Sequence, residues 1–217
     1  TGGRLHLAHV STRGAVALIR QAKEEGLTVT AEVAPHHFTL TEEAVEGYNT
    51  NAKMNPPLRL AADVEALKEG LRDGTLDAIA TDHAPHHRDE KEVEFDQASY
   101  GVVGLETALP LTLRLVNARV FSLSDALRKL TVNPARILGL PYGALSVGAP
   151  ADVVIFDPAC RWRLEGKKLR SKSKNTPFDG WELTGKVILT MVGGRVVYDD
   201  KEAVSDQQSA ISRKKVE

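Results

Sequence analysis

The sequence has little of several features that mark particular classes of protein. Its 217 residues include one cysteine, Cys160, so an internal disulfide is excluded and a reducing compartment such as the cytoplasm is expected. No apolar run approaches the roughly 20 residues that a membrane-spanning helix needs, so we expect no membrane partner. The net charge of −1 gives no electrostatic basis for binding nucleic acid. The composition therefore predicts a cytoplasmic globular protein.

What the sequence does contain is a cluster of ionisable groups directly after a short apolar segment. Residues 76–80 predict a strand, and Asp82, His83 and His86 follow it at once. In parallel α/β proteins the catalytic groups collect where strands end. Aspartate and histidine serve both as zinc ligands and as proton carriers. We therefore interpret this cluster as a site for chemistry and not as a solvated polar loop.

Two further strands are predicted upstream, and both also end in histidine. His9 closes a strand near residue 5, a helix is predicted over residues 13–25, and His36 and His37 follow a strand over residues 27–34. A lone histidine at a strand end is more often structural than a ligand. Three such ends in one strand–helix series favour a shared site, because parallel strands bring their carboxyl ends to one face.

The sequence, including the segments around these strand ends, resembles bacterial-type (class I) dihydroorotase, a zinc-dependent cyclic amidohydrolase of pyrimidine biosynthesis. The resemblance covers all but the end of the chain, and its motifs around Asn55 and Asp82 are the most specific ones. The similar segments are residues 9–12 (HVST), 32–37 (EVAPHH), 53–59 (KMNPPLR), 80–86 (ATDHAPH), 100–107 (YGVVGLET), 131–136 (TVNPAR), 148–152 (GAPAD) and 193–198 (GGRVVY).

The resemblance implies an α/β fold, the carboxyl-terminal part of a TIM-like (β/α)8 barrel followed by a small β domain. Residues 1–140 would hold strands six to eight of the barrel, residues 141–200 the small β domain, and residues 201–217 a polar tail that we expect to be disordered. The family's His-x-His pair, bridging carboxylate and additional histidine have no counterpart in this sequence. We therefore expect the carboxyl-terminal half of a longer enzyme, inactive by itself.

The resemblance also implies roles for individual residues. Asp82 would be the general acid/base and a metal ligand, and His9 a ligand of the second of two zinc ions. Asn55 and His86 would bind dihydroorotate, and the backbone at Tyr100 and Gly101 would contact its ring. The family usually has phenylalanine where Tyr100 stands, a departure that we do not expect to change function.

Some polar residues keep more than one interpretation. His36, His37 and His83 are expected to support the ligands or to pack, and His6 to lie outside the pocket. Arg59 is either a structural ion-pair partner or a substrate ligand.

The predicted function is the reversible hydrolysis of dihydroorotate to N-carbamoyl-aspartate, by an enzyme that we expect to be a homo-oligomer. One alternative is a related cyclic amidohydrolase, a hydantoinase or allantoinase. Another is a non-catalytic dihydroorotase-like partner of aspartate carbamoyltransferase.

Overall fold

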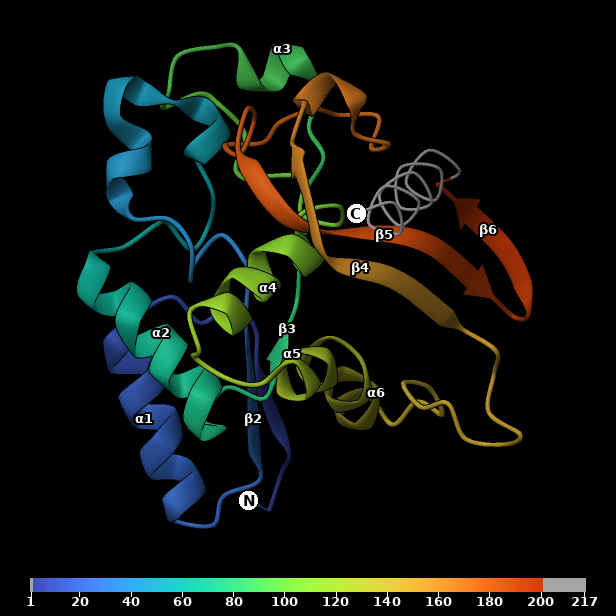
Figure 1. Cartoon of the computed structure of the whole chain (residues 1–217). Helices are drawn as coiled ribbons and strands as arrows, with labels where there is room; N and C mark the ends of the chain where they lie inside the picture. Colours follow the sequence, from blue (N-terminus) through green and yellow to red (C-terminus); the bar gives the residue numbers. More distant parts are fainter. Residues whose placement is uncertain (1, 201–217) are drawn as a thin grey trace, which may run out of the picture.

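The computed structural model describes residues 2–200, which form two separate three-stranded sheets (Figure 1). The first sheet is parallel and the second is antiparallel. The tail predicted at residues 201–217 lies outside the described residues. The predicted α/β class is confirmed.

The parallel sheet consists of three short strands joined by helices. Its order is β1 (Leu5–Leu7), β2 (Val29–Val33) and β3 (Ala78–Ile79). Helix α1 (Arg13–Glu24) joins β1 to β2, and helix α2 (Ala61–Asp73) precedes β3. These strands do not close on themselves, so an eight-stranded barrel is not present in residues 2–200.

Helix α1 shows how local sequence sets an element's bounds. Thr12 Oγ1 accepts a hydrogen bond from Ala15 N at 3.2 Å and so caps the first turn. Val16 and Ile19, three residues apart, are buried on one face of the helix. The helix ends before Gly26, whose φ of 77° is left-handed.

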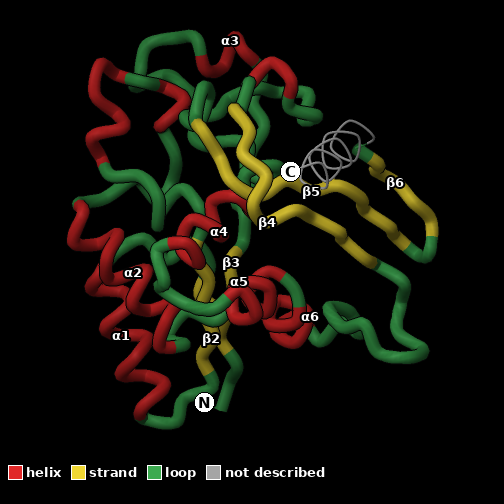
Figure 2. Tube along the Cα trace, in the orientation of Figure 1, coloured by secondary structure: helices red, strands yellow, loops and turns green. Residues whose placement is uncertain are grey.

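Helices lie on two sides of the parallel sheet. Helices α5 and α6 contact β3, while α1 and α2 pack against each other on the opposite side of the picture (Figure 2). None of the helices in residues 2–200 is long and apolar enough to cross a membrane. The remaining helical segments are α3 (Arg88–Lys91), α4 (Ala108–Asn117), α5 (Leu123–Leu130) and α6 (Val132–Leu138), with 3-10 turns η1 (Glu42–Tyr48), η2 (Thr50–Ala52) and η3 (Gly166–Lys168).

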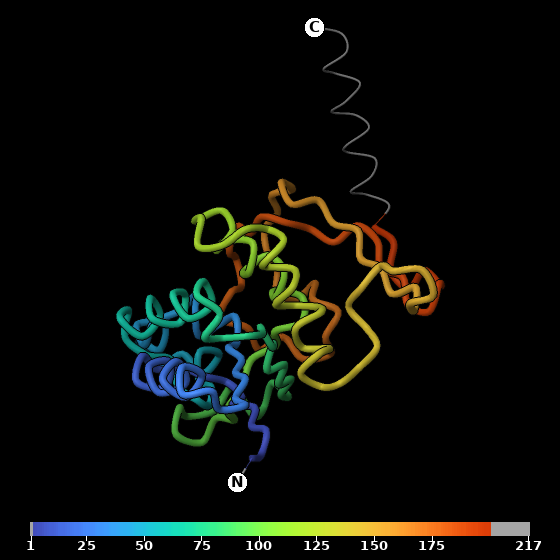
Figure 3. The backbone as a smooth tube through the Cα atoms, turned by 90° about the horizontal axis from the view of Figure 1, so that it is seen from below, coloured from blue at the N-terminus to red at the C-terminus, as the bar shows by residue number. Residues whose placement is uncertain are grey.

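The antiparallel sheet is built from β4 (Val153–Arg163), β5 (Glu182–Val192) and β6 (Arg195–Asp199). Strand β5 ends and β6 begins on either side of Gly193 and Gly194, a pair of residues typical of a hairpin turn. Strand β4 is one continuous strand, although its pairing with β5 shifts register after Asp157. Seen from below, the sheet lies on the far side of the molecule from α1 and α2 (Figure 3).

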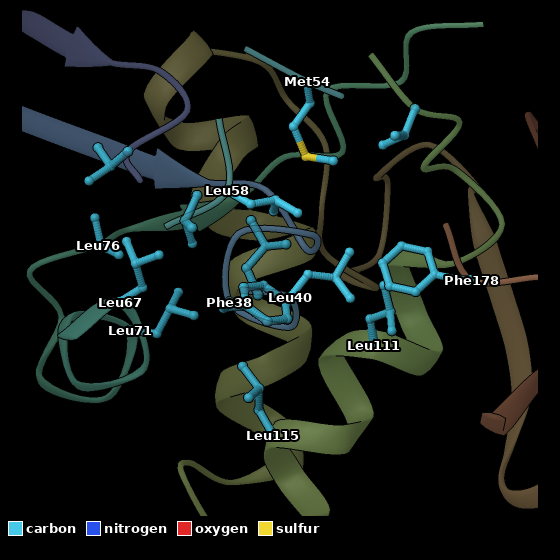
Figure 4. Close-up of a cluster of buried hydrophobic side chains, with 14 of the residues drawn as sticks. Phe38, Leu40, Met54, Leu58, Leu67, Leu71, Leu76, Leu111, Leu115 and Phe178 are labelled. Carbon is cyan, nitrogen blue, oxygen red and sulfur yellow. The ribbon is translucent and has the colours of Figure 1, made fainter. Parts of the chain in front are cut away.

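One hydrophobic cluster connects the two parts of the chain. Phe38, Met54 and Leu67 belong to it, and so does Phe178 from the second part (Figure 4). Leu183 of β5 is a further member. All five side chains are at most 2% exposed. The segment before β5 is therefore packed firmly against the layer that carries the strand ends.

Candidate active site at the strand ends

Two of the parallel strands are followed by a residue with left-handed backbone. His9 lies beyond β1 with φ 55°, and Asp82 lies beyond β3 with φ 46°. This conformation is uncommon outside glycine and breaks the in–out alternation of a strand. His9 Nε2 and Asp82 Oδ1 are 3.6 Å apart. The structure thus brings together the two residues predicted to bind metal.

A third group at this edge, Glu32 of β2, was missed by the sequence analysis. Its carboxylate lies 3.3 Å from His9 Nδ1 and 3.2 Å from His6 Nε2. His6 thus shares this carboxylate with His9, and its position outside the pocket stays a prediction. A charged residue inside a strand of a parallel sheet, where apolar runs are the rule, was the available signal.

His36 and His37 are buried beside this pair, with their rings 4.3 Å apart. Burial, and then the neighbouring His37 and His9, hold the pKa of His36 well below its usual value. Burial also lowers the pKa of His37, although its hydrogen bond to Pro56 O and the nearby Asp82 act in the other direction. Because the Pro56 carbonyl can only accept, His37 Nε2 donates the 2.8 Å bond and Nδ1 keeps its lone pair. Both rings are therefore neutral at pH 7.

The residues predicted to bind substrate lie on three segments that contact one another through their backbones. Gly101 N donates to Lys53 O at 2.9 Å, which joins the segment before Asn55 to the segment after Tyr100. Ala84 N donates to Val102 O at 2.9 Å, which joins the loop that carries His86 to the same segment. His86 is half-buried, and a Cβ built on Gly101 would lie 3.3 Å from His86 Nε2.

The side chains of Asn55 and Tyr100 are the more open members of this group. Asn55 is exposed and its amide makes no hydrogen bond within residues 2–200. Tyr100 is 59% exposed, and Lys53 Nζ lies 4.4 Å from the centre of its ring. The Asn55 amide is therefore free to receive a small molecule, whereas the predicted contact at Tyr100 is through its backbone.

Neighbouring polar residues hold the loops in place. His83 Nδ1 accepts a hydrogen bond from Gly104 N at 3.1 Å. Arg59 Nε donates to Ser11 Oγ at 3.4 Å. Asn175, which the sequence analysis also missed, bonds to the loop of His86, and its place in a Ser/Lys-rich stretch gave no signal of this.

A cavity of about 360 Å³ opens beside His86. Its wall is polar and carries more cationic than acidic side chains. The lining comes from residues 50–51, residues 86–88, Lys91, Glu92 and residues 172–175.

The donor chemistry at the strand ends fits part of a zinc site. His36 Nε2 and His37 Nδ1 are buried and have no hydrogen-bond partner. His9 Nδ1 lies 3.3 Å from Glu32 Oε1 but makes no hydrogen bond with it. Imidazole nitrogen and carboxylate oxygen are both zinc ligands. No group of three or more His, Cys, Asp or Glu side chains that could hold a metal occurs within residues 2–200. His9 and Asp82 can thus supply two ligands, fewer than the three protein ligands of a typical catalytic zinc.

The sequence of this chain is similar to curated dihydroorotases. The chain is 62% identical over 198 residues to the dihydroorotase of Syntrophotalea carbinolica, covering 91% of this chain and 47% of that protein. It is 58% identical over 197 residues to the dihydroorotase of Geobacter sp. strain M21, covering 91% of this chain and 46% of the relative. The chain spans about half the length of the curated relatives it matches.

Solved structures of related hydrolases share the fold. L-hydantoinase from Arthrobacter aurescens superposes with a TM-score of 0.86 at 36% identity, covering 91% of this chain and 45% of that one. Dihydropyrimidinase from Brevibacillus agri gives a TM-score of 0.87 at 25% identity, covering 92% of this chain and 46% of that one. The family model described as "Amidohydrolase family" matches residues 2–197. Because that match takes in nearly the whole chain, this chain belongs to the amidohydrolase family.

Proposed function

We propose that this chain is part of a dihydroorotase, a zinc-dependent hydrolase that opens the cyclic amide of dihydroorotate to N-carbamoyl-aspartate. The observation that carries the proposal is the approach of His9 Nε2 and Asp82 Oδ1 to 3.6 Å at the ends of two parallel strands. The identity of 62% to a dihydroorotase supports this substrate.

Asp82 is the proposed general acid/base. Zinc, when bound by His9 and Asp82, supplies Lewis acidity and lowers the pKa of bound water. The Asp82 carboxylate takes a proton from the attacking water and delivers it to the ring nitrogen as the amide bond breaks.

Asn55, His86 and the backbone at Tyr100 and Gly101 are the proposed substrate-binding groups. The exposed Asn55 amide offers a donor and an acceptor, which suits a ring that carries amides and a carboxylate. His86 can donate a hydrogen bond to that carboxylate. This division leaves metal binding to the strand ends and substrate binding to the loops.

The wider setting is also a proposal. Residues 1–140 would form strands six to eight of a barrel and residues 141–200 a small β domain, in a cytoplasmic homo-oligomer that holds two zinc ions. Aspartate carbamoyltransferase is the candidate partner.

A hydantoinase-type reaction is the second candidate, because the solved structures that share the fold include an L-hydantoinase at 36% identity. Assays of the complete protein with dihydroorotate, hydantoin and allantoin separate the two. We expect turnover of dihydroorotate far above the others. Faster turnover of hydantoin would reject the proposal, and turnover of none of them would favour a non-catalytic partner.

A further inference from the structure

We propose that Asn175 is a positioning residue that holds the two substrate-binding loop segments, residues 84–86 and residues 101–103, in register with each other. This inference rests on the proposed function, because it concerns the groups assigned there to substrate binding. Asn175 lies in the segment between η3 and β5, far along the chain from both loops.

The side-chain amide of Asn175 connects both segments. Its Nδ2 donates to Ala84 O at 2.9 Å and to Gly101 O at 3.1 Å. Its Oδ1 accepts from His86 N at 3.2 Å. Both amide hydrogens thus meet a carbonyl, and the amide oxygen meets the backbone of the proposed substrate ligand. Asparagine provides these donors and this acceptor on one short side chain.

The backbone of Asn175 adds a fourth link, because Val103 N donates to Asn175 O at 2.9 Å. The residue is 5% exposed, so its bonds are shielded from water. A buried polar group that loses its partner costs the full desolvation free energy of that group. A network in which every group is paired therefore resists opening and is rigid.

The geometry between the two loops is tight enough for this link to matter. A Cβ on Gly101 would lie 2.4 Å from Ala84 Cβ and 3.3 Å from His86 Nε2. Lys91 Nζ holds the Gly101 carbonyl from another side at 3.1 Å. Loss of the Asn175 amide would leave His86 N without its partner and the Ala84 carbonyl without its donor, while Ala84 N–Val102 O still joined the two segments and Lys91 still held Gly101.

The nitrogen and the oxygen of the Asn175 side-chain amide are already hydrogen-bonded to the two loops, so Asn175 acts through these loops. It therefore has no role in the chemical step itself. Misplacing a binding group by about 1 Å can reduce catalytic efficiency by about 100-fold.

The test uses Asn175→Ala and the isosteric Asn175→Asp in the complete protein. Asn175→Asp keeps an acceptor for His86 N but turns an oxygen toward the Ala84 and Gly101 carbonyls. For both variants we expect the KM for dihydroorotate to rise about 10-fold with kcat changed by less than about threefold, because binding geometry is lost and the chemistry is not. Zinc content should stay unchanged.

Asn133→Ala is the matched control. Asn133 Nδ2 donates to Asp77 O at 2.8 Å, an amide-to-carbonyl bond at the opposite end of β3. This variant should lose stability without any change in KM, so it separates general destabilisation from loop positioning.

A double-mutant cycle tests the route of the effect. In a His86→Ala background, Asn175→Ala should raise KM by no more than about threefold, because residues that act through one another are not additive. An unchanged KM in both Asn175 variants, or the full 10-fold effect in the His86→Ala background, would overturn the inference while leaving the proposed function intact. Absence of dihydroorotate turnover by the unsubstituted protein would instead overturn the proposed function, and this inference with it.

Discussion

At the scale of single residues, the site depends on where the backbone leaves the strand. The left-handed conformations of His9 and Asp82 place an imidazole and a carboxylate 3.6 Å apart at the sheet edge. Glu32 fixes the other side of His9, with its carboxylate 3.3 Å from Nδ1. A carboxylate beside a metal-binding histidine orients the ring and raises its basicity. Substitution of these residues should therefore affect chemistry and metal binding before stability.

Asp82→Asn in the complete protein should reduce kcat by about 10²–10⁴-fold, because the proposed proton carrier is lost. Much of the substrate binding should remain, since the proposed binding groups lie on other segments. Steady-state kinetics with dihydroorotate and a binding measurement check both expectations. Asp89→Asn, at an exposed carboxylate of α3, is the control, and wild-type turnover in Asp82→Asn would remove Asp82 from the mechanism.

Asn55→Ala and His86→Ala should both weaken dihydroorotate binding and slow turnover. Each loses a hydrogen bond to a charged ligand, worth about 1.5–3 kcal/mol. Zinc content, measured by metal analysis of the purified variants, should match that of the unsubstituted protein. Loss of zinc in either variant would show that the division between metal-binding and substrate-binding residues is incorrect.

Lys91 gives a pH-dependent expectation at the same scale. Burial, and then the nearby Lys53, lower the pKa of Lys91 from 10.5 to about 8. Between these two values the unfolded chain binds more protons than the folded one, so this residue makes the free energy of unfolding rise with pH. Denaturant titrations from pH 7.5 to 10.5 should show that rise, and Lys91→Met should reduce it. If the free energy of unfolding depended on pH equally in the unsubstituted protein and in Lys91→Met, the lowered pKa of Lys91 would be contradicted.

At the scale of elements, the contact of α4 with β5 ties the antiparallel sheet to the layer that carries the site. Gly185 of β5 has φ 98°, and a Cβ there would lie 2.2 Å from Leu113 Cδ1 of α4. The close approach also places Gly185 O 2.9 Å from Trp162 Nε1. The position requires glycine both for its backbone and for the packing of the helix.

Gly185→Ala should therefore lower the free energy of unfolding by about 1–3 kcal/mol, through backbone strain and overpacking. Chemical denaturation of the complete protein measures the change. Gly14→Ala is the matched control, because Gly14 lies in α1 with open space around its Cβ position, and it should leave stability equal or slightly higher. Equal stabilities of Gly185→Ala and the unsubstituted protein would show that α4 can shift without cost.

At the scale of the whole molecule, the parallel sheet is open. Its edge strand β1 has one neighbour, and apolar side chains near that edge are exposed, with Leu5 at 54% and Leu27 at 56%. Unpaired strand edges favour association with another chain. Within residues 2–200 no group of three or more His, Cys, Asp or Glu side chains could hold a metal, whereas a catalytic zinc normally has three protein ligands.

The 217-residue chain expressed alone should therefore hydrolyse no dihydroorotate and bind zinc weakly, and we expect it to self-associate. Size-exclusion chromatography and metal analysis measure these properties. A monodisperse monomer with stoichiometric, tightly held zinc would contradict the expectation.

Much of the site could be predicted from sequence because its signals are local. The apolar segments ending in His9 and in Asp82 show where strands stop, and the series of strands and helices puts those ends on one face. Thr12 and Gly26 likewise mark the bounds of α1. Proline is a poor helix residue in general, so the sequence around Pro134 does not by itself predict helix α6. Pro134 lies in the first turn of α6, where its missing N–H costs nothing.

Other features became visible only in the tertiary structure. A charge inside a strand marks Glu32 as unusual, but nothing local shows that it meets His9, and Asn175 carries no local signal at all, because each contact joins segments that are distant in sequence. The continuity of β4 across Asp157 depends on its pairing with β5. By itself, the sequence determined the strand ends and the chemical types present at them, since hydrophobic period and turn residues are local properties. The tertiary structure alone decided which of those groups meet and which buried amide holds the loops, because long-range packing sets these contacts.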